Sequence, residues 1–196
     1  MTPSTDSEER VATTLMKVAR NSLREAAGLG ASLSENTDWL ELRGACFVTL
    51  RSAGSLRGCI GSVRAYRPLV EDVAANTRSA ALQDPRFSPV VAEELEDIEI
   101  EVSVLSEPEL LDIRSESELL EVLRPGVDGL ILEYGGHRGT FLPAVWRELA
   151  DPNEFVRRLK LKAGLSADFW SEEIQVWRYS TASYRESDLS ATRQSV

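Results

Sequence analysis

Residues Ile98–Leu105, which read IEIEVSVL, decide the fold class of this chain. Apolar and polar side chains alternate along this stretch, and a period of two is typical of a β-strand with one buried face. The polar face carries two glutamates and a serine, so we expect it to face water. Such a strand belongs in an antiparallel or mixed sheet, because the strands of doubly wound sheets are buried on both faces. We therefore predict an α+β fold, with an antiparallel or mixed sheet flanked by helices.

Further segments have the pattern of strands joined by tight turns. Ala45–Leu50 is a short apolar run, and after a turn at 51–55 the chain returns along Leu56–Val63. These two segments are predicted to form a hairpin. A second hairpin on a two-glycine turn and a final strand are predicted at 129–134, 137–142 and 173–179.

Capping boxes, first-turn prolines and apolar residues at helical spacing indicate four helices. They are predicted at 7–27, from Pro68 to the stop at Asp84-Pro85, at 115–123, and from Asp151 to a C-cap at Gly164. Residues 181–196 lack an apolar pattern and are predicted to be a disordered tail. Without a repeat or a low-complexity linker, residues 1–180 are predicted to form one domain.

The composition excludes several classes of site. With 22 basic and 32 acidic residues among 196, the formal net charge is −10, which argues against a general nucleic-acid or anionic-membrane surface. Two cysteines cannot build a disulfide framework or a Cys-rich metal site, and one histidine excludes sites with two imidazoles. We expect no metal and no cofactor. No apolar run suits a membrane span, and the polar N-terminus is not a targeting signal, so we expect a cytoplasmic protein.

Positive charge is concentrated in one segment. Between Leu42 and Val70 there are five arginines and no acidic residue, and we call this segment the basic island. It favours an anion-facing surface, since guanidinium groups match carboxylates and phosphates. In the structural alternative, these arginines pair with acidic side chains elsewhere, for instance in Glu93–Glu101, which carries six acids.

The hexapeptide Leu56–Gly61 (LRGCIG) is the second feature. Gly58 and Gly61 weaken a strand, and they indicate a bulge or a close approach of another group to the backbone. Cys59 lies between them, and a positive charge near it would raise the thiolate fraction of a reachable thiol. The alternative is a small buried hydrophobe, which free cysteines most often are.

The two cysteines are not expected to form a disulfide. A hairpin that turns around Ala53 pairs Phe47 with Cys59 and Cys46 with Ile60. Because side chains alternate between the faces of a sheet, the two thiols then lie on opposite faces. A register shift of one residue would reverse this expectation.

Two polar loops complete the candidate set. Gly135–Thr140 (GGHRGT) is a glycine turn whose amides could point at an anion, with His137 as the sole imidazole base and Arg138 as a carboxylate-binding side chain. The alternative is an exposed hairpin tip. In Asp84–Phe87 (DPRF), Arg86 either binds a ligand or pairs with the aspartate two residues before it to lock the turn.

In their order along the chain, these motifs resemble the AMMECR domain family. LRGCIG resembles the six-residue signature of that family. The resemblance continues at Asp84–Pro89, Val102–Leu105, Gly126–Leu130, Arg138–Pro143, Lys162–Gly164 and Trp170. It covers about residues 8–180, and the stretches FLPAVWREL and LKLKAGL resemble the prokaryotic members, called protein A of the AmmeMemoRadiSam system.

The resemblance implies a larger and a smaller subdomain with a cleft between them, which the hexapeptide faces. It also implies a three-protein system, whose other members are a Memo-like protein and a radical SAM enzyme. In the family pattern Arg138-Gly139-Thr140 is fixed whereas the position of His137 varies. This favours anion binding by the turn over a general-base role for His137.

Three functions are open at this point. The first is a component that binds an anionic small molecule or modified macromolecule and acts with the Memo-like and radical SAM proteins. Its ligand-binding residues would be Arg57, Gly58, Gly61, Arg86, Arg138 and Thr140. The second is an enzyme with Cys59 as catalytic thiol and His137 as a weaker candidate. The third is a nucleic-acid-binding regulator that uses the basic island, which the net charge disfavours.

Overall fold

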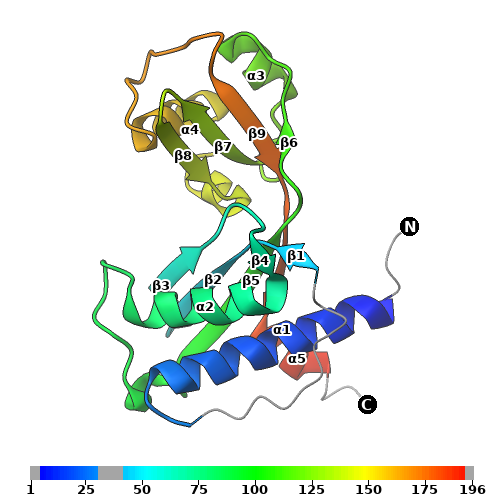
Figure 1. Ribbon diagram of the computed structural model, residues 1–196, viewed down its shortest axis with the longest axis vertical. Coiled ribbons are helices and arrows are strands. Elements are labelled where there is room, and N and C mark those ends of the chain that lie inside the picture. The colour runs from blue at the N-terminus through cyan, green and yellow to red at the C-terminus, as the bar shows by residue number, and fades with distance from the viewer. Residues whose placement is uncertain (1–4, 31–41, 193–196) are drawn as a thin grey trace. The chain divides into compact units, whose positions relative to one another are not determined.

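In a computed structural model of the chain, which describes residues 5–30 and 42–192, strand β5 (Ile98–Leu105) forms where the alternation predicts it. Its two isoleucines and Val102 are buried. The chain folds as two compact units (Figure 1). Unit 1 contains the residues up to Val104 and those from Ala182, and unit 2 contains Leu105–Thr181. Unit 2 is therefore inserted within the chain of unit 1.

Unit 1 is built on a four-stranded sheet in the order β10-β5-β2-β3. The other strands are β2 (Cys46–Ser52), β3 (Ser55–Gly61) and β10 (Thr181–Arg185). Helices α1 (Thr5–Ala26) and α2 (Leu69–Leu82) share a core with the buried side chains of β2 and β5. The intervening side chains of β2 and β5 lie on the opposite face. A two-residue ladder, β1 (Arg43–Gly44) with β4 (Arg67–Pro68), and a short 3-10 turn, η2 (Ala92–Glu94), complete the unit.

The β2–β3 hairpin forms with a register two residues away from the predicted one, pairing Phe47 with Gly61. The turn is centred between Ala53 and Gly54, whose φ angles of 48° and 78° suit a two-residue hairpin turn. This centre accounts for one residue of the difference. A bulge after Leu50 accounts for the other.

A two-residue shift preserves the faces, so the expectation for the cysteines is confirmed. Cys46 points into the core of unit 1 and is buried, whereas Cys59 pairs with Thr49 and is partly exposed. Both thiols are free.

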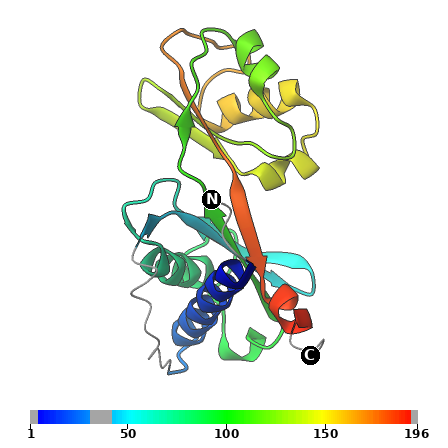
Figure 2. The ribbon, with the colours of Figure 1, turned by 90° about the vertical axis from the view of Figure 1, so that its right-hand side faces the viewer.

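The predicted disordered tail is wrong for residues 181–192, which form β10 and α5 (Glu186–Thr192). Residues 193–196 lie outside the described residues. β10 returns to unit 1 as the neighbour of β5 (Figures 1 and 2). This segment is held by apolar and polar contacts together. Tyr184 and Leu189 pack against the core, while Ser183 bonds Ser103 at 2.8 Å and Arg185 pairs with Glu101 at 3.2 Å. Two apolar residues five positions apart do not form a recognisable hydrophobic pattern in the sequence.

Unit 2 contains a second four-stranded sheet, in the order β6-β9-β7-β8. Its strands are β6 (Glu109–Leu110), β7 (Gly129–Tyr134), β8 (His137–Phe141) and β9 (Gln175–Tyr179). Its helices α3 (Glu116–Val122) and α4 (Pro152–Lys162) and the 3-10 helix η3 (Pro143–Arg147) contribute to the core of this unit. In that core the rings of Trp146 and Phe155 stack with their centroids 3.8 Å apart.

The pairings β1–β4, β2–β3, β2–β5, β6–β9, β7–β8 and β7–β9 are antiparallel, and helices pack on the sheets, so the α+β prediction is confirmed. None of the described helices has the length and apolar character needed to cross a membrane.

Candidate functional site

Cys59 lies on β3, on the face of the unit 1 sheet that is turned away from α1 and α2. Its cross-strand partner is Thr49, whose Oγ1 donates a hydrogen bond to Cys59 Sγ at 3.4 Å. Glu101 of β5 is opposite Thr49 on its other side, and Arg185 of β10 pairs with Glu101. These four residues form a row across four strands, which we call the polar row. It presents a thiol, a hydroxyl, a carboxylate and a guanidinium group in sequence.

Two side chains take the place of a neighbouring strand beside Cys59. β3 is an edge strand, so backbone groups on its outer side have no ladder partner. The Cys59 N–H instead donates to Asp84 Oδ2 at 2.8 Å, and Arg86 Nη2 donates to the Cys59 carbonyl oxygen at 3.4 Å. The hexapeptide and the DPRF loop thus meet at one place.

Arg86 and Asp84 also bind each other. Arg86 Nε lies 2.9 Å from Asp84 Oδ1 and Nη2 lies 2.7 Å from Oδ2, which is the locked turn of the structural alternative. The Arg86 side chain is nevertheless 53% exposed, while that of Asp84 is 2% exposed. The anchored guanidinium therefore remains open to solvent beside Cys59.

Asp84, Arg86 and Cys59 interact electrostatically. The hydrogen bond from Arg86 holds the pKa of Asp84 well below its usual range, against the opposing effect of burial. The hydrogen bond to Asp84 raises the pKa of Arg86, and the charge of Cys59 and a hydrogen bond to it act in the same direction. Arg86 is thus a permanent cation within interaction range of the thiol.

Arg57 pairs with an acidic side chain of the protein, which is the structural alternative proposed for the basic island. Its Nε and Nη2 bind the two carboxylate oxygens of Glu94 at 2.7 and 2.9 Å. Nη1 and Nη2 also donate to the carbonyl oxygens of Ser88 and Pro89, at 2.9 and 3.4 Å. The side chain is 14% exposed, so ligand binding by Arg57 would require breaking these contacts. Its partner is one of the six acids of Glu93–Glu101, the segment proposed from the sequence.

The two glycines of the hexapeptide are places of close approach, but the approaching groups belong to the protein. A Cβ at Gly58 would lie 2.3 Å from the carbonyl oxygen of Ala80 in α2. A Cβ at Gly61 would lie 2.3 Å from the ring of Phe47. Gly58 lets α2 pack against β3, and Gly61 makes room for an aromatic ring.

Other arginines of the basic island are also engaged within the protein. Arg67 Nε donates to the buried carboxylate of Asp72 at 2.8 Å, Arg43 to the Tyr66 carbonyl at 3.2 Å, and Arg51 to the Gly54 carbonyl at 3.5 Å. Nucleic-acid binding therefore gains no specific support from these contacts.

A buried polar network beside Cys46 was not named from the sequence. Asp72, which is fully buried, accepts hydrogen bonds from the Cys46 N–H, the Ser62 hydroxyl and the Asn76 amide at 2.9, 2.8 and 2.9 Å. Burial, and then the charge of Asp72, raise the pKa of the Cys46 thiol. The Asp72–Asn76 spacing on α2 was its only sequence signal. The network joins α2 to the end of the sheet and leaves Cys46 inert.

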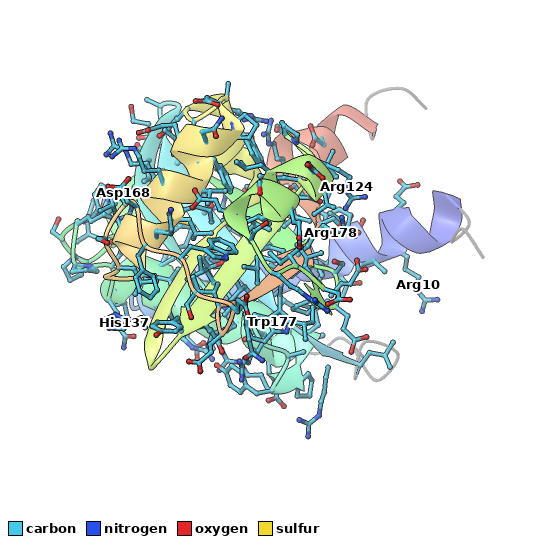
Figure 3. All side chains as sticks on the ribbon, turned by 90° about the horizontal axis from the view of Figure 1, so that it is seen from above. Arg10, Arg124, His137, Asp168, Trp177 and Arg178 are labelled. Atoms are coloured by element: carbon cyan, nitrogen blue, oxygen red, sulfur yellow. The ribbon has the colours of Figure 1, made fainter. Side chains whose placement is uncertain are left out.

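The remaining candidates lie on β8 of unit 2. His137 is exposed, as the hairpin-tip alternative predicts, and is labelled in Figure 3. Its Nδ1 hydrogen-bonds to the carbonyl oxygen of Ala163 at 3.1 Å, at the end of α4. Strand alternation places Arg138 and Thr140 on the other face of β8.

Arg138 and Thr140 both have partners within unit 2. Arg138 pairs with Glu133, its cross-strand neighbour, at 3.1 Å. Thr140 Oγ1 donates to the carbonyl oxygen of Leu130 at 2.9 Å and lies 3.2 Å from the Tyr179 hydroxyl. Burial raises the pKa of Tyr179 to about 12. These contacts organise the sheet, and His137 is not grouped with them.

The predicted site residues are thus divided between the two units. Arg57, Gly58, Cys59, Gly61 and Arg86 belong to unit 1, and His137, Arg138 and Thr140 to unit 2. Within unit 1 the structure groups Cys59 with Arg86 and adds Thr49 and Asp84. Thr49 was missed because cross-strand contacts depend on a register that the bulge shifts.

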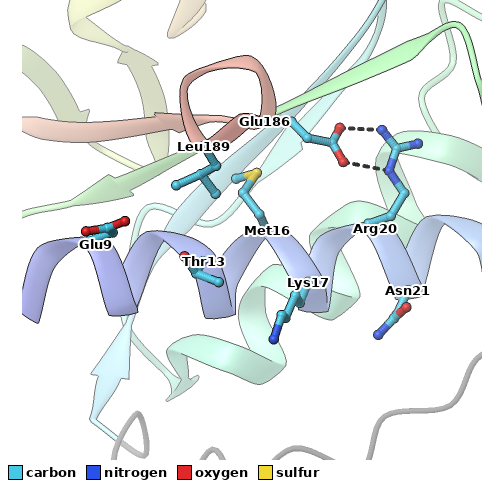
Figure 4. Close-up of a pocket in the computed structure, with 8 residues that line it drawn as sticks. All are labelled: Glu9, Thr13, Met16, Lys17, Arg20, Asn21, Glu186 and Leu189. Atoms are coloured by element: carbon cyan, nitrogen blue, oxygen red, sulfur yellow. Dashed lines mark hydrogen bonds and ion pairs between the residues drawn. The ribbon is translucent and has the colours of Figure 1, made fainter. Parts of the chain in front are cut away.

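A separate cavity of about 300 Å³ lies between α1 and α5 (Figure 4). At one end the Arg20 guanidinium forms a two-bond ion pair with Glu186 and also donates to the carbonyl oxygens of Leu95 and Ile98. The cavity contains none of the predicted site residues. Among residues 5–30 and 42–192, no group of three or more His, Cys, Asp or Glu residues could hold a metal ion.

Comparison with known proteins gives consistent results. The family model AMMECR1 matches residues 16–184. A protein of Methanothermobacter thermautotrophicus is 41% identical over 178 residues, covering 88% of this chain and 93% of the relative. Protein MJ0810 of Methanocaldococcus jannaschii is 43% identical over 150 residues, covering 74% of each chain. The crystal structure of the uncharacterized protein PH0010 from Pyrococcus horikoshii is similar with a TM-score of 0.80 and 35% identity, over 88% of this chain and 89% of that one.

Proposed function

Because the chain belongs to the AMMECR1 family, we propose that it is a non-catalytic, anion-binding component of the prokaryotic system that its motifs resemble. It acts in the cytoplasm with a Memo-like protein and a radical SAM enzyme, as protein A of that system. The ligand is an anionic small molecule or a modified macromolecule. The observation that carries this proposal is the position of Arg86 beside Cys59.

The geometry of Arg86 suits an anion-binding group. Asp84 fixes the guanidinium through Nε and Nη2, so little side-chain freedom is lost on binding. Nε and Nη2 make the hydrogen bonds to Asp84 and to the Cys59 carbonyl oxygen, and Nη1 is the nitrogen that donates to a bound carboxylate or phosphate. The polar row beside it offers the Thr49 hydroxyl and the Cys59 thiol to the same ligand.

The partner of the thiol within unit 1 supports binding without catalysis. Cys59 receives a hydrogen bond from a hydroxyl group, which does not act as a general base at neutral pH. The only histidine of the chain, His137, belongs to unit 2 and bonds a carbonyl oxygen there. Unit 1 therefore lacks a base–nucleophile pair that uses an imidazole.

The anion preference can be tested without knowing the ligand. Cys59 is alkylated separately with iodoacetate, which is anionic, and with iodoacetamide, which is neutral, and the quotient of the two rates is the charge ratio. We expect Arg86→Gln to lower the charge ratio about two- to fivefold, the effect of one exposed charge pair. Arg78→Gln is the control, because Arg78 is similarly exposed at 45% but lies on α2 and pairs with Glu25 of α1 at 3.1 Å, and it should leave the ratio unchanged. An unchanged ratio in Arg86→Gln would refute the proposal.

Association with partners has its own test. The tagged chain is co-expressed with the Memo-like protein and the radical SAM enzyme of the same organism and purified under reducing conditions. We expect co-purification that protects Cys59 from iodoacetamide. A chain that purifies alone in every combination would contradict the partner proposal.

A thiol enzyme is the second candidate, and the Thr49–Cys59 hydrogen bond favours it. A donor at Sγ stabilises a thiolate, and Arg86 adds a positive charge. Cys59→Ser abolishes the activity of the intact three-protein system in this case, whereas a non-catalytic component keeps it.

A further inference from the structure

We infer that Asp84 is the positioning residue of the Cys59–Arg86 site: one buried carboxylate holds the Cys59 backbone and aims the Arg86 guanidinium at the thiol. The inference deepens the proposed function and rests on it. It assigns a role to a residue that touches neither the ligand nor the thiol directly.

The Asp84 carboxylate is fully used by two partners. Oδ2 accepts the Cys59 N–H at 2.8 Å and Arg86 Nη2 at 2.7 Å. Oδ1 accepts Arg86 Nε at 2.9 Å and the Arg86 backbone N–H at 3.1 Å. Four donors occupy the lone pairs of one carboxylate, so its orientation is fixed in two directions.

The surrounding backbone explains why Asp84 reaches Cys59. Gly58 allows α2 to contact β3, since any larger residue would meet the Ala80 carbonyl oxygen at 2.3 Å. Asp84 follows the last residue of α2, Leu82, by two positions. The loop then closes through the Phe87 N–H, which donates to the Asp84 carbonyl at 3.1 Å, and the Val90 N–H, which donates to the Ala81 carbonyl at 2.8 Å. The carboxylate is thereby held against the edge of β3.

The hydrogen bonds of Asp84 and Arg86 can fix the Cys59 backbone because β3 is an edge strand. A central strand would have the Cys59 backbone fixed by a neighbour on each side, whereas β3 has only β2. Asp84 and Arg86 supply the acceptor and the donor of the absent strand. The backbone position that sets the direction of the thiol therefore depends on one ion pair.

Unit 2 offers a matched control for this role. Asp128 is also fully buried, and it also binds one arginine: the Arg124 backbone N–H at 2.8 Å, and its Nε and Nη2 at 2.9 and 2.6 Å (Arg124 is labelled in Figure 3). This pair closes a turn within unit 2, and unit 2 contains no cysteine. Asp128→Asn therefore removes the same chemistry from the fold without removing it from the Cys59 site.

The experiment measures the charge ratio of Cys59 in the full chain for Asp84→Asn, Arg86→Gln, the double variant and Asp128→Asn. We expect Asp84→Asn to lower the ratio about two- to fivefold, as Arg86→Gln does, because a released guanidinium no longer faces the thiol. The double variant should show no further loss, since both changes remove one interaction. Asp128→Asn should keep the wild-type ratio.

Each outcome decides between the two proposals. A loss in Arg86→Gln but not in Asp84→Asn overturns the positioning role and leaves the proposed function intact. A wild-type ratio in Arg86→Gln overturns the proposed function and the positioning role with it. An equal loss in Asp128→Asn also overturns the positioning role, because general destabilisation then explains the effect.

A second measurement on the wild-type chain keeps the inference falsifiable if Asp84→Asn does not fold. Hydrogen exchange of the Cys59 amide should be slow, as for an amide bonded to a buried acceptor. Exchange at the rate of an open edge amide would overturn the role of Asp84.

Discussion

Arg57 of β3 binds Glu94 of η2 through two hydrogen bonds, Nε to Oε1 at 2.7 Å and Nη2 to Oε2 at 2.9 Å. This bidentate pair joins the hexapeptide to the segment that follows the DPRF loop. Arg57, two residues before the candidate thiol, is therefore a structural residue. Arg86, from a distant part of the chain, is the cation that faces Cys59.

Replacement of Arg57 should reduce stability rather than anion binding. The side chains of Arg57 and Glu94 are 14% and 31% exposed, so Arg57→Gln leaves a half-buried carboxylate with fewer donors. We expect a loss of about 1–3 kcal/mol in urea unfolding and an unchanged charge ratio at Cys59. A lower charge ratio at wild-type stability would show that Arg57, and not Arg86, attracts anions.

Acid should weaken the Asp84 contact in a defined direction. Hydrogen bonding to Arg86 lowers the pKa of Asp84 in the folded state. A lowered pKa gives stability that is present above the unfolded value of about 3.9 and is lost as the pH falls through the folded value. We therefore expect the free-energy difference between wild type and Asp84→Asn to be constant from pH 7 to about pH 5 and to shrink below that.

Urea unfolding of both proteins between pH 7 and pH 2.5 measures this difference. Asp128→Asn, measured at neutral pH, shows how much stability is lost when another buried, arginine-bound aspartate is replaced. A difference that is the same at both ends of the range would mean that the charge of Asp84 does not contribute.

Gly58→Ala should be costly because the added methyl group meets backbone. The new Cβ would be 2.3 Å from the Ala80 carbonyl oxygen, so α2 must move away from β3. We expect a loss of about 1–3 kcal/mol in thermal or urea unfolding, together with a changed charge ratio at Cys59. Gly30→Ala is the control, since a Cβ there meets nothing within 4 Å. Equal stability of the two variants would contradict the close packing of α2 on β3.

The buried Lys160 of α4 should respond asymmetrically to replacement. Its Nζ lies 2.6 Å from Glu116 Oε2, and the lysine side chain is 1% exposed while that of Glu116 is 31% exposed. Glu116→Ala leaves a buried ammonium without its carboxylate, and we expect a loss of about 2–3 kcal/mol, reduced by the partial exposure of Glu116. Lys160→Met removes the buried charge and should change stability by less than about 1 kcal/mol. A greater loss in Lys160→Met than in Glu116→Ala would contradict this view of the pair.

Local patterns were sufficient for many elements. Alternation predicted β5, and a two-glycine turn predicted the β7–β8 hairpin, because both depend on neighbours in the chain. The faces of Cys46 and Cys59 were predicted correctly despite a register error, since the error was an even number of residues. The Asp84–Arg86 pair was foreseen as a locked turn, because its members are two residues apart.

Contacts between distant segments could not be predicted in this way. The insertion of unit 2 depends on β10 returning to β5, and the residues that hold β10 are mostly polar and resemble a disordered tail. The Thr49–Cys59 contact depends on the bulge after Leu50, and no residue type near Leu50 predicts a bulge there. The Cys59–Asp84 hydrogen bond depends on how closely α2 approaches β3.

Protection of Cys59 by an anion tests the central claim most directly. Iodoacetamide alkylation is followed by mass spectrometry in pyrophosphate and in chloride at equal ionic strength, with buried Cys46 as the internal reference. We expect pyrophosphate to slow alkylation of Cys59 in the wild type and to have no such effect in Arg86→Gln. Equal rates in the two salts for the wild type would contradict an anion site at Arg86 and Cys59.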